Sequence, residues 1–204
     1  VAEVDELENP KHHAALPFSQ VPQFVERLRA TNSGEITKLA FEFLILTVSR
    51  TSEALLATKS EIDLDTGVWT VPADRMKAKR EHRVPLAPRS IEIVRQAARV
   101  NGDGTLVFPG PTGRPLSNIV FLSILRRMEL SITAHGFRSA FSDWAAETTS
   151  YPREVVEMAM AHTIKNKVEA AYRRGDLLEK RRELMEEWSA FVSGGRDVKA
   201  VVSR

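Results

Sequence analysis

The sequence has no cysteine in its 204 residues, which excludes a disulfide framework and a thiolate metal site. This absence fits a reducing cytoplasm. No apolar run approaches the roughly 18–20 residues that a membrane span requires. The first ten residues, VAEVDELENP, are acidic and do not resemble a signal peptide. We therefore expect a cytoplasmic protein with no membrane partner.

The common motifs of metal and nucleotide chemistry are also missing. The five histidines (positions 12, 13, 82, 135 and 162) show no HExxH motif and no zinc-ligand spacing. GxGxxG, GxxxxGK[ST] and GxSxG do not occur. The polar positions also lack the converging carboxylates that a two-metal nuclease needs. The sequence therefore predicts chemistry without a metal ion or a cofactor.

The net charge is only +2, but the cations are unevenly placed along the chain. Residues 75–83 carry five Lys or Arg against one acid, and residues 165–182 carry seven against three. Clustered cations on a nearly neutral background indicate a local anionic partner. Each run taken alone also suits an ordinary solvated surface.

The apolar periodicity predicts a mainly α protein with a small three-stranded antiparallel β-sheet (α+β). Helices are predicted at 19–30, 35–48, 51–58, 88–100, 117–129, 136–149, 152–160, 165–173 and 176–192. Strands are predicted within 61–72, on both sides of the turn Asp65-Thr66-Gly67, and at 82–86. Ser19 is the predicted N-cap of the first helix.

Arg50 stands at the end of a very apolar helix, where a charged side chain requires a partner. Glu53, three residues on, is close enough to form an ion pair with it. An arginine in such a place can also grip an anion. Both interpretations can hold, because a carboxylate can orient a guanidinium that also faces a phosphate.

Three further places carry polar residues of interest. The basic tip at 75–83 offers Lys77 and Lys79, on either an ordinary exposed turn or an arm that enters a DNA groove. In 135-HGFR-138 the spacing puts His135 and Arg138 on one helical face, out of the core or in a cleft.

The third place is 161-AHTIKNKVEAAYRR-174, which holds His162 and Tyr172. Ten residues separate them, so a loop at 163–166 has to fold back to bring them together. A tyrosine at helical spacing usually fills a core or a surface. The arginines, lysines, histidines and tyrosine of these places, taken together, favour a functional interpretation. Each of these side chains can donate a hydrogen bond to an anionic oxygen, and the tyrosine can act as a nucleophile. The set suits metal-free chemistry on a phosphodiester.

The order Arg, hairpin Lys, His-x-x-Arg, His, Tyr resembles the tyrosine recombinases, the phage integrase family. The resemblance covers about 18–192. It is carried by 50-RTSE-53, by IDLDTGVWTVPADRMKAKREHRVPL, by 135-HGFRSAF-141 and by 161-AH…AAY-172. The wording is closest to integrases of prophages and genomic islands of the satellite-phage type. Two departures are Ala161 and Val48-Ser49, where many members of the family have glycine.

The resemblance implies Tyr172 as the nucleophile on a DNA phosphate. Arg50 and Arg138 would bind the two non-bridging oxygens. His135 and His162 would add hydrogen bonds, and one of the two would accept the tyrosyl proton.

Lys77, rather than Lys79, would protonate the departing 5′ oxygen, and Glu53 would hold the first arginine box in place. Candidates for contact with the DNA backbone are Lys79, Arg80, Lys165, Lys167 and Arg173.

The function implied is that of a site-specific recombinase that integrates or excises a mobile element through a 3′-phosphotyrosyl intermediate. Implied partners are double-stranded attachment sites, three further copies of the chain on DNA and an accessory directionality factor. The isolated chain could be a monomer, and the place of action would be the bacterial nucleoid. The alternatives are a type IB topoisomerase and an inactive DNA-binding regulator.

Three parts of the chain follow from the resemblance. Residues 1–17 are expected to be a linker from a missing N-terminal DNA-binding region, and residues 18–192 a catalytic domain. Residues 193–204 are expected to be a tail that is mobile or docks on a partner.

Overall fold

The computed structural model describes residues 14–162 and 175–194. It confirms the expected fold class, since helices surround one antiparallel three-stranded sheet in the order β1-β2-β3. The helices are α1 (Val21–Ala30), α2 (Glu35–Thr47), α3 (Thr51–Leu55), α4 (Pro88–Asn101), α5 (Val120–Arg127), α6 (Gly136–Thr148), α7 (Arg153–Ala159) and α9 (Leu178–Val192). Short 3-10 helices precede α1 (Phe18–Gln20) and β1 (Lys59–Glu61).

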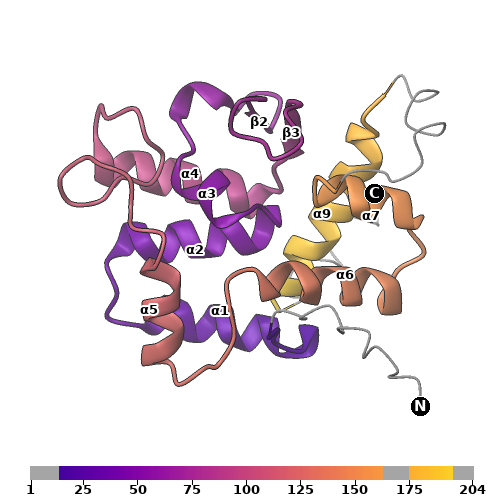
Figure 1. Cartoon of the computed structure of the whole chain (residues 1–204), viewed down its shortest axis with the longest axis horizontal. Coiled ribbons are helices and arrows are strands. Elements are labelled where there is room, and N and C mark those ends of the chain that lie inside the picture. The colour runs from indigo at the N-terminus through magenta and orange to yellow at the C-terminus, as the bar shows by residue number, and fades with distance from the viewer. Residues whose placement is uncertain (1–13, 163–174, 195–204) are drawn as a thin grey trace, which may run out of the picture.

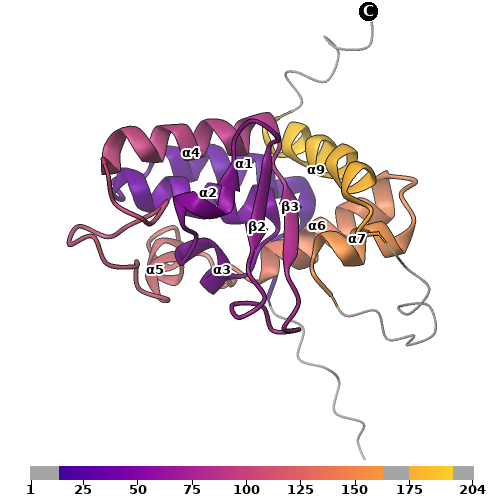
Figure 2. The ribbon, with the colours of Figure 1, turned by 90° about the horizontal axis from the view of Figure 1, so that it is seen from above.

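The sheet is a hairpin of two four-residue strands with a shorter third strand at its edge. Its strands are β1 (Ile62–Asp63), β2 (Val68–Val71) and β3 (His82–Pro85). Trp69 pairs with Val84 and faces the core, where it is fully buried. Figures 1 and 2 show the hairpin between α4 and α9, with its β2–β3 tip projecting beside α3.

The core is built from aromatic side chains of helices that lie far apart in the sequence. Phe41 of α2 stacks on Phe121 of α5, with ring centroids 4.4 Å apart. On the other side of the molecule Trp144 of α6 lies 5.1 Å from Trp188 of α9. Burial of side chains of this size stabilises a fold by about 1.5–3 kcal/mol each. Phe41 also lies 5.6 Å from Phe137 of α6, and Trp188 Nε1 donates to the carbonyl oxygen of Ile45 of α2 at 2.9 Å, so α6 and α9 are both held against α2.

A buried carboxylate on α2 joins this helix to α1 and α4. Glu42 of α2 is 2% exposed and accepts hydrogen bonds from Arg29 of α1 and Arg89 of α4. Burial raises the pKa of Glu42, but the two guanidiniums outweigh that effect and the net pKa is lowered. The charge is therefore kept inside the protein by two partners.

Several predicted boundaries need correction. Ser19 lies in the 3-10 turn, and Gln20 occupies the N-cap position of α1 with no side-chain cap. The helix predicted at 51–58 ends at Leu55, after which the chain makes a turn into Lys59–Glu61. The helix predicted at 176–192 begins at Leu178, because Leu177 adopts a left-handed backbone.

Two predicted segments lie outside the described residues. These are the helix at 165–173 and nearly all of the tail at 193–204. None of the helices within the described ranges is long and apolar enough to cross a membrane.

Candidate active site

Arg138, one of the predicted site residues, is deeply buried. It lies in the first turns of α6 and is 3% exposed. Of the two expected placements, out of the core or in a cleft, the first was therefore wrong for Arg138. Its guanidinium donates to the carbonyl oxygen of Val48 and, at 2.5 Å, to that of Met160. Burial, with the nearby charge of Arg50, lowers the pKa of Arg138 to about 10. It therefore stays cationic at neutral pH.

Arg50 is tied to Glu53 in the way the spacing predicts. Its Nη1 lies 2.7 Å from Glu53 Oε1, and its backbone N–H donates to Glu53 Oε2 at 2.8 Å. Arg50 begins α3 rather than ending α2, because α2 stops at Thr47. Its Nη2 also reaches the carbonyl oxygen of Ala161 at 3.4 Å. The side chain keeps 25% of its surface exposed and can still meet a ligand.

The two arginines therefore converge on one short segment, Met160 to His162. Each donates to a carbonyl of that segment, and the charge of one acts on the pKa of the other. Like charges this close repel in the absence of an anion. An oxyanion placed between them would relieve the repulsion and accept hydrogen bonds from both.

The two departures from glycine prove to be strained positions. Val48 has φ of 54° and Ala161 has φ of 51°, both in the left-handed region that favours glycine. A β-branched residue there is a genuine outlier. These are also two of the three residues whose carbonyls receive the arginines. The strain thus falls where the backbone turns its carbonyls toward Arg50 and Arg138.

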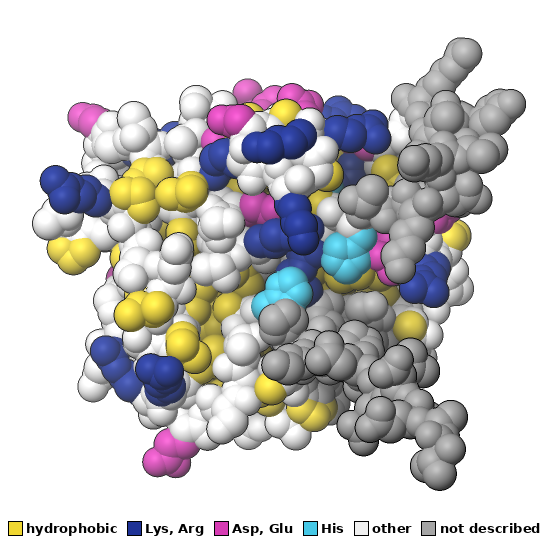
Figure 3. Space-filling model, viewed as in Figure 1, with side chains coloured by type: hydrophobic (Ala, Val, Ile, Leu, Met, Phe, Trp, Pro, Cys, Tyr) yellow, Lys and Arg dark blue, Asp and Glu magenta, His cyan; other side chains and the backbone are white. Residues whose placement is uncertain are grey.

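His162 and His135 are both exposed. The Nδ1 atom of His162 lies 2.6 Å from Glu157 Oε2 at the end of α7. His135 occupies the N-cap position of α6 and is exposed, as the sequence predicts. Figure 3 shows two histidine side chains beside a group of Lys and Arg side chains at the centre of this face.

Gly136 lies between His135 and Arg138, and the packing around it explains why this position is a glycine. The periodicity of the sequence does not reveal that packing. A Cβ at this position would lie 2.6 Å from the carbonyl oxygen of Ala14 and 2.9 Å from Ala15 Cα. The segment that leads into α1 therefore passes directly over the start of α6. A hydrogen bond from Thr133 N to the same carbonyl, at 3.2 Å, holds it there.

The β2–β3 tip presents its two lysines differently. Lys77 is exposed, and no described residue binds its side chain. Lys79 has a left-handed backbone, with φ of 52°, and its Nζ donates to the carbonyl oxygen of Asp74 at 3.3 Å. Arg80, a predicted contact of the DNA backbone, is exposed beside them.

His82 is a residue of this region that the sequence pattern did not single out. It lies on β3, and burial lowers its pKa to about 4, with the charges of Arg181 and Arg138 acting in the same direction. A hydrogen bond to the backbone of Ala159 and the charge of Glu53 oppose the shift. His82 is therefore neutral at neutral pH and joins β3 to the end of α7. Its place on a predicted strand gave no sign of this link.

Tyr172, Lys165, Lys167 and Arg173 lie outside the described residues. The chain after them is anchored at Asp176, whose carboxylate receives both Arg83 of β3, at 2.8 Å, and Arg181 of α9, at 3.0 Å. Arg181 is 1% exposed and also donates to the carbonyl oxygens of Asp176 and Arg83. Tyr172 is thus four residues from a point fixed to the hairpin.

Tyr151 contrasts with these residues. Its hydroxyl donates to Glu187 Oε1 at 2.8 Å, and burial together with that carboxylate raises its pKa above the ordinary value of a tyrosine. A phenol held in this way is a poor nucleophile.

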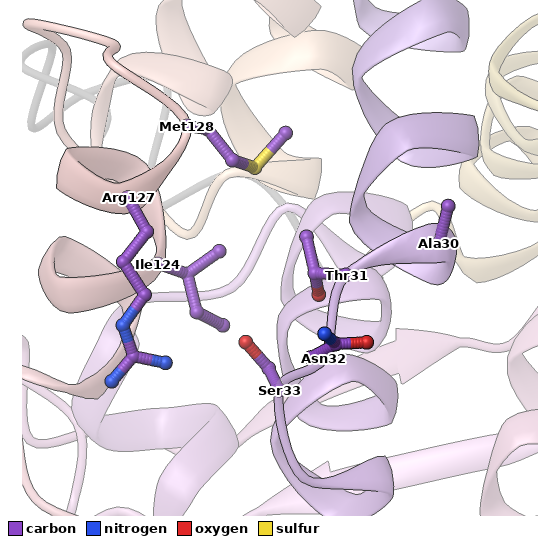
Figure 4. Close-up of a pocket in the computed structure, with 7 residues that line it drawn as sticks. All are labelled: Ala30, Thr31, Asn32, Ser33, Ile124, Arg127 and Met128. Carbon is purple, nitrogen blue, oxygen red and sulfur yellow. The ribbon is translucent and has the colours of Figure 1, made fainter.

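One hollow lies away from the predicted site. It has a volume of about 360 Å³ and lies between the α1–α2 loop and the end of α5. Figure 4 shows Arg127 and Ile124 of α5 across from Thr31, Asn32 and Ser33 of the loop. It contains none of the predicted catalytic residues.

Comparison with known proteins gives a consistent result. The sequence matches the phage integrase family over residues 15–177. It is 33% identical over 186 residues to the prophage integrase IntA of Escherichia coli (strain K12), covering 89% of this chain and 45% of that protein. It is 31% identical over 206 residues to the integrase of Enterobacteria phage P4, covering 92% of this chain and 47% of that protein. The chain thus spans about half the length of these relatives.

Among solved structures, a lambda integrase fragment bound as a dimer to a core site matches with a TM-score of 0.60. The identity is 17%, and the match covers 77% of this chain and 60% of the other. At that identity the likeness concerns the fold alone, which is that of a tyrosine recombinase catalytic domain. The matched residues include both arginine boxes and the hairpin between them, and the chain belongs to the phage integrase family of tyrosine recombinases.

Proposed function

We propose that this chain carries the catalytic centre of a site-specific DNA recombinase that integrates or excises a mobile element. The observation that carries the proposal is the convergence of Arg50 and Arg138 on the segment from Met160 to His162. Backbone carbonyls hold Arg138, while the Glu53 carboxylate and the carbonyl of Ala161 hold Arg50. Two guanidiniums directed at one segment in this way suit the binding of one oxyanion. The relatives named above are integrases, so DNA relaxation by a topoisomerase is not favoured.

In the first step, the phenolic oxygen of Tyr172 attacks the scissile phosphorus. A free phenol has a pKa near ~10, so it needs a base to take its proton. His135 and His162 are the proposed candidates, and either is suited to that role. Arg50 and Arg138 bind the non-bridging oxygens, because a planar guanidinium donates in pairs and stays charged.

In the same step the bond from phosphorus to the 5′ oxygen breaks. Lys77 gives a proton to that oxygen, which leaves as a hydroxyl, while the phosphate stays on Tyr172 as a 3′-phosphotyrosyl ester. The ester conserves the energy of the phosphodiester, so a second 5′ hydroxyl can reverse the reaction on another strand. Each step uses side chains of this chain and calls for no metal ion.

The partners proposed are double-stranded DNA sites and further copies of the chain. Lambda integrase has been solved as a tetramer bound to a Holliday junction. By analogy we propose that four copies act together on DNA, with Arg80 and Lys79 near the tip meeting its backbone. An accessory directionality factor and action at the nucleoid belong to the same proposal.

The test is a DNA substrate with a nick just beyond the cleavage site. Cleavage releases the short fragment that carries the free 5′ hydroxyl, so that religation is prevented and the covalent adduct is trapped. Tyr172→Phe is expected to bind this DNA and to form no adduct. Tyr151→Phe is the matched control and is expected to form the adduct like the unchanged protein, since its hydroxyl is held by Glu187. An adduct with Tyr172→Phe would refute the proposed nucleophile.

A further inference from the structure

The β2–β3 tip, residues 72–81, is built as two consecutive turns. Backbone hydrogen bonds join Arg75 N to Pro72 O (3.1 Å) and Met76 N to Ala73 O (3.2 Å). A third joins Lys79 N to Met76 O at 3.0 Å. The backbone of the tip is therefore held by its own hydrogen bonds. A contact that fixes the first residues of the tip also fixes the direction in which Lys77 extends.

Arg75 fixes that base. Its Nη2 forms an ion pair with Glu61 Oε2, and its Nη1 donates to the carbonyl oxygen of Glu53 at 3.4 Å. Glu61 is itself held by the indole Nε1 of Trp69, at 3.0 Å. Met76, next in the chain, is 3% exposed and packs into the core. Two residues before Lys77, the tip is thus fastened to both α3 and the sheet.

The residue that receives Arg75 is the one that holds the first arginine. Glu53 accepts from Arg75 through its backbone carbonyl and binds Arg50 through its carboxylate. We call Arg50 and Arg138 the phosphate clamp and the β2–β3 tip with Lys77 the lysine tip. Glu53 therefore contacts both the phosphate clamp, through Arg50, and the lysine tip, through Arg75. By contrast, the Nε of Arg75 is buried and has no hydrogen-bond partner among the described residues. A buried unsatisfied N–H is costly, which a side chain chosen only to fill space would avoid.

We infer that Arg75 is a positioning residue for proton transfer: it holds the tip so that the Lys77 ammonium reaches the 5′ oxygen that leaves. The inference rests on the proposed function and assigns Arg75 no contact with DNA. It also accounts for the exposure of Lys77, whose side chain binds no residue within 14–162 or 175–194. Because Arg75 fastens the tip, the Lys77 ammonium does not need an ion pair of its own and can donate its proton.

The experiment compares two DNA substrates under single-turnover conditions. One carries the natural phosphodiester at the cleavage site, and the other carries sulfur in place of the bridging 5′ oxygen. Attack by Tyr172 then breaks a phosphorus–sulfur bond, and the thiolate leaves without accepting a proton. A defect in proton donation disappears on the sulfur substrate, whereas a defect in phosphate binding or in folding remains.

Arg75→Met is expected to slow cleavage of the natural substrate by about 10–10², a part of the usual contribution of a general acid. It is expected to cleave the sulfur substrate at nearly the rate of the unchanged protein. Glu61→Gln, which removes the ion pair and keeps an acceptor for Trp69, is a second variant and is expected to behave in the same way. Equal slowing of both substrates, or no slowing of either, would overturn the inference.

Three controls separate the inference from the proposed function. Arg182→Met removes an arginine that donates to the carbonyl oxygen of Gly67, in the β1–β2 turn of the same sheet, at 3.3 Å. It is expected to change neither rate. Arg50→Ala is expected to stay slow on both substrates, and Lys77→Ala to be restored by sulfur. If Lys77→Ala were not restored, or the unchanged protein cleaved neither substrate, the proposed function itself would fail.

Discussion

The phosphate clamp and the lysine tip supply cations to the same proposed phosphate, but the protein holds them in opposite ways. Arg138 is buried, and its guanidinium is bound by two backbone carbonyls. Lys77 is exposed, and its side chain binds none of the described residues, while the neighbouring Arg75 is fastened to Glu53. Carbonyl oxygens orient a guanidinium without cancelling its charge, which suits a group that grips an anion throughout the reaction. A lysine that gives up a proton gains from remaining unbound.

The largest effect expected is on the clamp. Arg138→Ala should lower single-turnover cleavage by about 10²–10³, the usual cost of losing one oxyanion donor. The sulfur substrate should not restore it, in contrast to Arg75→Met. Arg138→Lys keeps the charge but cannot reach both carbonyls, so it should remain impaired. Full activity in Arg138→Lys would show that the positive charge alone is sufficient and that a guanidinium oriented by two carbonyls is not required.

The next effect concerns residues 14 and 15, which pass over the start of α6. Gly136→Ala should destabilise the protein by about 1–3 kcal/mol, because its Cβ meets backbone atoms that cannot rotate away. Gly104→Ala is the matched control, since no atom lies within 4 Å of the added Cβ. Urea denaturation measures both. Equal midpoints for the two variants would mean that residues 14 and 15 do not constrain the start of α6.

The smallest effect, with the opposite sign, comes from the strained backbone. Ala161→Gly should stabilise the protein by about 0.5–1 kcal/mol, because relief of the left-handed strain exceeds the added entropy of the unfolded chain. Ala146→Gly, at an exposed position of α6, should destabilise it by about 1 kcal/mol. Denaturation midpoints that move in the same direction for both variants would contradict the strain at Ala161.

The sequence predicted what depends on local pattern. The fold class, the hairpin and the ion pair between Arg50 and Glu53 follow from periodicity, turn residues and spacing, and the structure has all three. It did not predict the burial of Arg138, because the helical face of a residue does not reveal which carbonyls its neighbours will present. The strain at Ala161 was visible only as a departure from a glycine.

Arg75, Gly136 and His82 were missed for a related physical reason. Each owes its role to a backbone atom distant in the sequence: the carbonyl of Glu53, that of Ala14, and the backbone of Ala159. Such contacts leave no periodic signal. Boundaries such as the start of α9 were missed because Leu177 adopts a left-handed backbone that propensity does not anticipate.

The most direct test of the central claim is a crystal structure of the protein bound to DNA that carries its cleavage site. We expect guanidinium nitrogens of both Arg50 and Arg138 to lie about 2.7–2.9 Å from non-bridging oxygens of one phosphate. We also expect the Tyr172 hydroxyl to lie in line with the 5′ oxygen of that phosphate. A scissile phosphate bound elsewhere on the surface, with the two arginines still facing only Glu53 and the carbonyls, would contradict this claim.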